Sequence, residues 1–264
     1  MRIARFGCLL LMIGATFAVQ AKMVQRPVEW TQDGTRFHSV LVYDDASTLK
    51  RPGLVMVPNW YGINDAAVRK AEMIAGKDYV ILLTDMYGAS VRPQQGNADQ
   101  AQAAVKPLYG DRALMRKRIN EALVQLKAQV ASAPIDAGKL AAIGFCFGGS
   151  AVLDLARSGA DVAAVVSFHG GLTTDDPALA KNIKARVLAM NGADDKGTMP
   201  DADKFMDEMR MSPVDWQFVV IGHAVHCFTE VGENSAGCRY DEHAATRSYR
   251  LMHDWLRAAF AGTP

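Results

Sequence analysis

Continuous apolar runs that alternate with helical segments constrain the fold of this chain more than any other feature. Such runs cover residues 53–57, 79–83, 139–143, 162–168, 185–190 and 216–221. Residues 111–128 and 241–260 have the spacing of helices instead. Strands that are apolar throughout are buried on both faces, which is typical of a mostly parallel sheet flanked by helices on both faces. Ligands of such α/β folds bind beyond the carboxyl ends of the strands.

The remaining segments complete this outline. Residues 23–45 are expected to be extended around a turn at Asp33 and Gly34. Residues 89–110 are rich in Gln, Gly, Pro and Ala, and we expect a loop or a broken helical segment there. No repeat or linker divides the chain, so residues 22–264 are expected to form a single domain.

The first 21 residues have the layout of a secretory signal peptide. Arg2 and Arg5 precede a short apolar stretch over residues 6–19, and Ala21 ends a segment suited to cleavage. An uncleaved membrane anchor is the alternative, but the apolar stretch is too short to span a bilayer. We therefore expect a periplasmic or secreted protein with no membrane segment after cleavage.

A nucleophile elbow follows the apolar run that ends at residue 143. Residues 144–148 read Gly-Phe-Cys-Phe-Gly, which is the elbow pattern with cysteine in place of serine. The flanking glycines permit the sharp turn, and the helix that follows would stabilise a thiolate at Cys146. The N–H of Phe147 could supply half of an oxyanion hole. The alternative is a buried structural cysteine in a glycine-rich turn.

An acid and a base follow the next strands in the order that hydrolases use. Asp194 and Asp195 come after the run that ends at residue 190, and His223 and His226 come after the following run. The order nucleophile, acid and histidine is that of α/β-hydrolases. Asp195 with the two histidines could also suggest a metal site, but the ligand set is incomplete.

These motifs resemble those of the dienelactone hydrolase family of the α/β-hydrolase superfamily. The resemblance extends over residues 28–260, and the matching segments are 59–65, 85–88, 144–149, 167–172, 192–195 and 226–229. It implies an α/β-hydrolase fold in which Cys146 is the nucleophile, His226 the base and Asp195 its orienting acid. It also implies that the N–H of Trp60 is the second oxyanion donor. The branch of the family with a signal peptide is the most similar.

The sequence departs from that family at two positions that would face a substrate. Asn59 stands where the family commonly has Glu, and Glu230 stands where it has an arginine that holds the substrate carboxylate. No arginine occurs near residues 99–102, where a second one belongs. An anionic dienelactone is therefore disfavoured as the substrate. We expect Asn59, Tyr61, Tyr87, His169 and Glu230 to line the substrate pocket.

The sequence thus predicts a cysteine-dependent hydrolase of a small ester, lactone or thioester that works through an acyl-thioester intermediate. The alternative is a catalytically weak relative that binds a ligand or a partner protein. A thiol redox protein is disfavoured because the elbow contains no C-x-x-C motif. We expect a small-molecule substrate, no cofactor, no metal and no nucleic-acid partner, because 29 basic and 28 acidic residues leave no basic excess.

The cysteines are expected to include one disulfide. Cys8 lies in the predicted signal peptide, which leaves Cys146, Cys227 and Cys238 in an oxidising compartment. Cys227 and Cys238 are close in sequence, and the residues between them are flexible enough to let them pair. Two buried free thiols, or an exposed Cys238, are the alternative.

Overall fold

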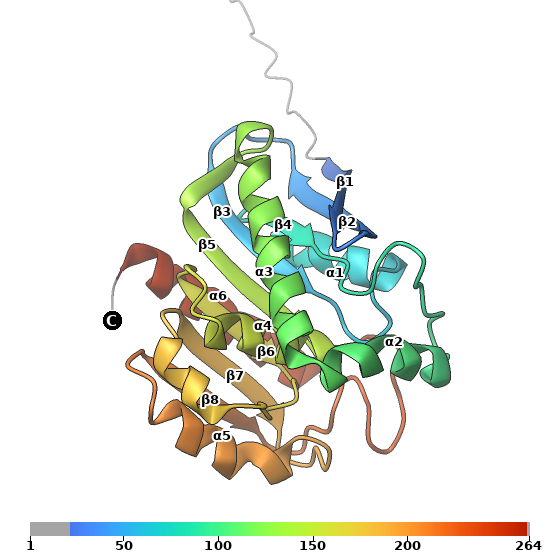
Figure 1. Ribbon diagram of the computed structural model, residues 1–264, viewed down its shortest axis with the longest axis vertical. Helices are drawn as coiled ribbons and strands as arrows, with labels where there is room; N and C mark the ends of the chain where they lie inside the picture. Colours follow the sequence, from blue (N-terminus) through green and yellow to red (C-terminus); the bar gives the residue numbers. More distant parts are fainter. Residues whose placement is uncertain (1–21, 263–264) are drawn as a thin grey trace, which may run out of the picture.

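The computed structural model describes residues 22–262, so the predicted signal peptide lies outside the described part of the chain. An eight-stranded sheet with the order β1-β2-β4-β3-β5-β6-β7-β8 forms its centre (Figure 1). The strands are β1 Met23–Gln32, β2 Thr35–Asp44, β3 Arg51–Val57, β4 Val80–Leu83, β5 Ile135–Phe145, β6 Ala164–Phe168, β7 Arg186–Gly192 and β8 Trp216–Ile221.

Strands β3 to β8 pair in parallel, whereas β1 and β2 form an antiparallel hairpin that joins the edge of β4. Asp33 and Gly34 both have positive φ, 50° and 76°, which matches the twist that a two-residue hairpin turn requires. The prediction of a mostly parallel sheet is confirmed, and the fold is that of the α/β-hydrolases.

Helices cover both faces of this sheet (Figure 1). Residues of α1 and α6 share one apolar core with the sheet, and residues of α2, α3, α4 and α5 share the other. The helices are α1 Asp65–Ala75, α2 Ala98–Gly110, α3 Arg112–Ala128, α4 Phe147–Arg157, α5 Ala202–Met209 and α6 Glu242–Ala261. Short 3-10 helices occupy Gln129–Ala131, Pro177–Asn182 and Met199–Asp201. Within residues 22–262, none of the helices combines the length and the apolar character that crossing a bilayer requires.

Residues 89–97 form the expected loop, whereas residues 98–110 form the continuous helix α2 and not the expected loop or broken helical segment. The side chain of Asn97 accepts a hydrogen bond from the N–H of Gln100 at 3.1 Å and so caps a regular helix. Two of its four buried residues are alanine, which has too small a side chain to give a strong apolar periodicity in the sequence. Pro107 lies inside the helix, and Asp111 then ends α2 and caps α3.

Helix α4, which follows Cys146, is buried along its whole length. Its last residue, Arg157, donates to Glu208 at 2.7 Å and to Asp154 at 3.0 Å, so the buried charge is paired. The helix that follows Cys146 is therefore held in place by packing on all sides and by a paired buried charge.

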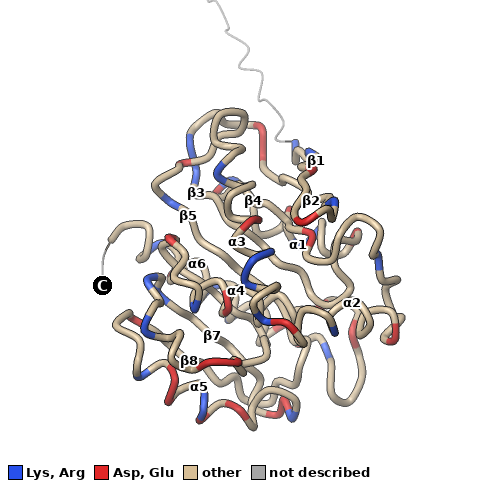
Figure 2. Tube along the Cα trace, viewed as in Figure 1, with Lys and Arg blue, Asp and Glu red and all other residues tan. Residues whose placement is uncertain are grey.

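Elsewhere basic and acidic side chains are interspersed along the trace, as Figure 2 shows.

Candidate active site

Cys146 lies in a sharp turn between β5 and α4, with φ 53° and ψ −116°. A Cβ atom on Gly144 would lie 2.0 Å from the carbonyl oxygen of Gly148. A Cβ atom on Gly148 would lie 2.1 Å from the carbonyl oxygen of Val57. Only glycine fits at both positions, so the local sequence dictates a turn that presents the sulfur atom above the sheet.

The structure brings Cys146, His226 and Asp195 together at the carboxyl ends of the parallel strands. The Nε2 atom of His226 lies 3.2 Å from the Sγ atom of Cys146, and its Nδ1 atom lies 2.7 Å from an oxygen of Asp195. Asp195 follows β7 and His226 lies in the loop after β8. The side chain of Asp195 is buried, whereas that of His226 is 22% exposed.

The surroundings of His226 favour its protonated form. Burial opposes protonation, but the hydrogen bonds with Asp195 and Cys146 outweigh it and raise the pKa of His226 to about 10. For Asp195, burial favours the neutral form, but the contact with His226 prevails and holds its pKa below the usual value. Thr198 also donates to the Asp195 carboxylate at 2.7 Å. The imidazolium therefore faces the sulfur at neutral pH, where it can deliver a proton to a leaving group.

A tight turn at residues 59–62 borders the same site, and the backbone amide of Trp60 in this turn has no acceptor within residues 22–262. The side-chain oxygen of Asn59 accepts a hydrogen bond from the N–H of Tyr61 at 3.0 Å, and the backbone carbonyl of Asn59 accepts one from the N–H of Gly62 at 2.9 Å. The N–H groups of Trp60 and Phe147 donate no hydrogen bond within the described residues 22–262. Both amides are thus free to bind an oxyanion.

A cleft of about 720 Å³ opens over these groups. Of the residues predicted for the substrate pocket and the oxyanion hole, Asn59, Trp60, Tyr61 and Glu230 line it beside the Cys146, Asp195 and His226 side chains. Asp194, the other candidate acid, also lines it, and so do residues that the sequence did not single out, including Tyr109, Gly171, Thr173, Lys196, Thr198, Asp201 and Glu233. Tyr109 lies at the end of α2, so recognising that helix from the Asn97 cap would have brought it to attention.

The match to known proteins covers most of this framework. Residues 37–260 match the sequence profile of the dienelactone hydrolase family. The chain belongs to the dienelactone hydrolase family. Family membership makes the protein a hydrolase of esters or lactones.

Relatives of this family member include a solved structure, the dienelactone hydrolase-like promiscuous phosphotriesterase P91 from metagenomic libraries. It is 36% identical, has a TM-score of 0.82, and the match covers 90% of this chain and 98% of P91. The Caenorhabditis elegans protein K02A2.1 is 35% identical over 154 residues, which are 56% of this chain and 95% of that protein. A Bradyrhizobium protein with the name "Probable 2-oxo-3-(5-oxofuran-2-ylidene)propanoate lactonase" is 31% identical over 54% of this chain and 56% of its own length.

Tyr87 and His169 lie behind the wall of the cleft of this hydrolase and do not line it, which corrects the sequence prediction. The Tyr87 hydroxyl donates to the carbonyl of Trp60 at 3.0 Å. The side chain of His169 is fully buried, its Nε2 atom lies 2.8 Å from the hydroxyl of Thr229, and its ring packs against that of His226. Burial holds the pKa of His169 well below its usual value, so this ring is neutral. Both side chains support residues that do line the cleft.

Glu230, at the position where the resemblance implied an arginine in other family members, is not an isolated charge. It forms an ion pair with Lys70 of α1, and it accepts a hydrogen bond from the side-chain nitrogen of Asn59 at 2.7 Å. The two charged side chains are 12% and 10% exposed. The lining of the cleft thus contains a carboxylate that is paired with a lysine at this position.

Cys227 and Cys238 form a disulfide in the structure, and both line the cleft. Cys146 is the free cysteine of the described chain. His223 is exposed in the loop before His226, at a positive φ of 64°. In residues 22–262, no three His, Cys, Asp or Glu side chains are grouped so as to hold a metal ion.

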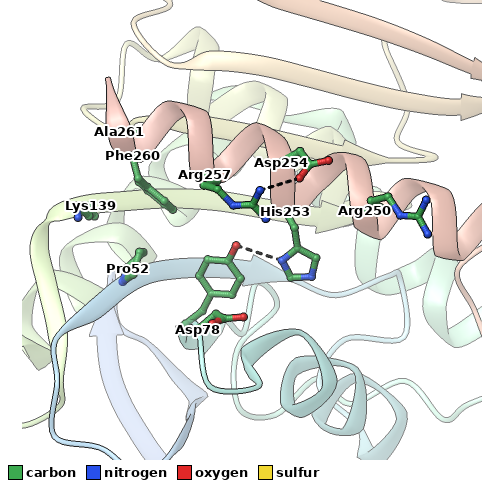
Figure 3. Close-up of a pocket in the computed structure, with 10 residues that line it drawn as sticks. Pro52, Asp78, Lys139, Arg250, His253, Asp254, Arg257, Phe260 and Ala261 are labelled. Atoms are coloured by element: carbon green, nitrogen blue, oxygen red, sulfur yellow. Dashed lines mark hydrogen bonds and ion pairs between the residues drawn. The ribbon is translucent and has the colours of Figure 1, made fainter. Parts of the chain in front are cut away.

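A second cavity of about 750 Å³ lies near the amino ends of β3 and β4, away from Cys146 (Figure 3). Its lining mixes basic and acidic side chains, and the hydroxyl of Tyr79 lies 3.2 Å from the Nδ1 atom of His253. Asp254 and Arg257 form an ion pair beside them at 3.2 Å. Four of the groups that line this cavity thus form two pairs with one another.

Proposed function

We propose that this protein hydrolyses small, neutral esters, lactones or thioesters with Cys146 as the nucleophile. The observation that carries the proposal is the chain of contacts from Asp195 through His226 to the sulfur, at 2.7 and 3.2 Å. The free N–H groups of Trp60 and Phe147 add the means to stabilise an oxyanion.

The reaction would proceed in two acyl transfers. The Cys146 thiolate attacks the carbonyl carbon, and the Trp60 and Phe147 amides bind the resulting oxyanion. Collapse of this intermediate breaks the bond to the leaving group, which takes a proton from His226. Water then attacks the acyl thioester while neutral His226 removes its proton. Cleavage of the carbon–sulfur bond releases the carboxylic acid and regenerates Cys146.

Charge and leaving group narrow the substrate class. Lys196 is the one Lys or Arg side chain in the cleft lining of the described chain, whereas Asp194, Asp201 and Glu233 are all acidic. These carboxylates disfavour an anionic substrate. Because a thiolate leaves more readily than an alkoxide, esters with stabilised leaving groups suit the site, such as enol lactones, aryl esters and thioesters.

Burst kinetics with 4-nitrophenyl acetate test the proposal. We expect one equivalent of 4-nitrophenol per Cys146 in the burst, and mass spectrometry should find an acetyl group on that cysteine. The substrate panel would include an enol lactone and a phosphotriester, because relatives carry lactonase and phosphotriesterase names. Turnover that persists in Cys146→Ala would refute the proposal, and a cleft that binds ligands without acyl transfer would support the ligand-binding alternative.

We also propose that residues 1–21 direct export, so that the mature protein works in the periplasm or outside the cell as a member of an exported branch of the family. The Cys227–Cys238 pair supports this, because disulfides persist in oxidising compartments. Cell fractionation and the intact mass of the recovered protein test it. A cytoplasmic protein that retains Met1–Ala21 would refute it.

A further inference from the structure

A partly buried chain of contacts leads from α1 to the turn at residues 59–62. Lys70 pairs with Glu230, Glu230 accepts from the side-chain nitrogen of Asn59 at 2.7 Å, and the side-chain oxygen of Asn59 accepts from the N–H of Tyr61 at 3.0 Å. We propose that the Lys70–Glu230 pair positions the Trp60 amide of the oxyanion hole through Asn59. This inference rests on the proposed function, because it concerns the oxyanion of the same acyl transfer.

The turn depends on which way the Asn59 carboxamide points. The side-chain oxygen of Asn59 accepts from the N–H of Tyr61, and the backbone carbonyl of Asn59 accepts from the N–H of Gly62. Asn59 thus pairs two amides of the turn, and the N–H of Trp60 is left unused. A flipped carboxamide would set its NH₂ group against Tyr61 N–H and its oxygen against the Glu230 carboxylate. Both contacts are repulsive, because each would bring together two donors or two acceptors. The negative charge of Glu230 therefore selects the orientation that builds the oxyanion turn.

The surroundings keep this charge in place. The Lys70 ammonium lies 4.2 Å from the centre of the Phe145 ring, and little of Lys70 or Glu230 is exposed. Without Lys70, a carboxylate would be left buried and unpaired, which favours its protonation or displacement. Glu230 also accepts from the Thr229 hydroxyl at 3.2 Å, and Thr229 contacts His169, which packs against His226. Changing Glu230 alone would therefore disturb two arms of the network, whereas changing Asn59 disturbs only the oxyanion arm.

Two assays on the full-length mature protein separate positioning from other effects. The first measures kcat and KM for 4-nitrophenyl acetate, and the second measures the rate of Cys146 alkylation by iodoacetamide, which forms no oxyanion. For Asn59→Ala we expect kcat to fall by about tenfold or more, because loss of an oxyanion donor typically costs a factor of about 100 to 1,000 and here the donor is misplaced instead of lost. The KM and the alkylation rate should change by less than about threefold.

A rescue pair tests the orientation argument. Asn59→Asp should lower kcat, because two carboxylates then face each other across the gap. Adding Glu230→Gln should restore most of the lost kcat, because the amide introduced at position 230 donates to the carboxylate introduced at position 59, which still accepts from the N–H of Tyr61. Gln95→Ala is the matched control, since Gln95 lines one cavity together with Asn59 and Glu230 but its side chain hydrogen-bonds to Asn64 and Glu233 instead. The Gln95→Ala variant should have the same kcat as the natural protein.

The outcomes distinguish the two proposals. If Cys146→Ala keeps full turnover, the proposed function itself fails. If Cys146→Ala is inactive but Asn59→Ala keeps the natural kcat, only the positioning role fails. The positioning role is also overturned if alkylation falls as much as kcat in Asn59→Ala, or if the double variant is no better than Asn59→Asp.

Discussion

Reduction of the Cys227–Cys238 disulfide should lower the free energy of unfolding by about 3 kcal/mol. The two residues are 11 positions apart, and closing a loop of this length in the unfolded chain removes about 9 cal/mol/K of entropy, or about 3 kcal/mol at 25 °C. Part of the loop stays in place without the bridge, because the N–H of Arg239 donates to the carbonyl of His226 at 3.0 Å. The native state should therefore survive reduction, and the change should appear mainly in the unfolded chain.

Urea unfolding of Cys146→Ala with the bridge oxidised or reduced measures this difference in one polypeptide. The variant excludes thiol exchange with Cys146, and the reduced form keeps every side chain of the oxidised one. Thiol titration of the unfolded natural protein, mature from residue 22, should give one thiol before reduction and three after it. Three thiols before reduction, or a stability difference below about 0.5 kcal/mol, would refute the reasoning.

Four further results are expected from the same site. Cys146→Ala should abolish the acylation burst while its far-UV circular dichroism stays unchanged, and a burst in this variant would contradict the assigned nucleophile. Asp195→Asn should lower the pKa of His226 from about 10, because the hydrogen bond with Asp195 stabilises the protonated ring in the natural protein and the variant lacks that carboxylate. NMR titration of histidine-labelled protein measures this pKa, and an unchanged value would contradict the assignment. As pH rises from about 6.5 to about 10, His226 of the natural protein should lose its positive charge, and the protein should lose the stability that the raised pKa of His226 supplies. A free energy of unfolding that stays constant over this pH range would count against the raised pKa. Gly148→Ala should lower the free energy of unfolding by about 1 to 3 kcal/mol in urea unfolding, since its Cβ would overlap the carbonyl of Val57. A variant as stable as the natural protein would show that the turn relaxes.

The sequence by itself determined the parallel sheet and the elbow, because both depend on local patterns. Apolar runs of strand length specify strands that are buried on both faces, whatever lies far away in the chain. Gly144 and Gly148 specify the elbow because the sharp turn leaves no room for a side chain at either position, and both lie within two residues of Cys146. The order of acid and base after later strands followed from the same alternation, but it left Asp194 beside Asp195 and His223 beside His226.

Only the tertiary structure decided which side chains meet. Lys70 and Glu230 are 160 positions apart, and nothing in the local pattern of either marks a partner for the other. His169 follows a strand as a pocket residue would, yet its side chain is fully buried and contacts the hydroxyl of Thr229, 60 positions later. Such contacts depend on how separate loops cross the ends of neighbouring strands, because each loop takes its path from packing against the others and not from its own sequence.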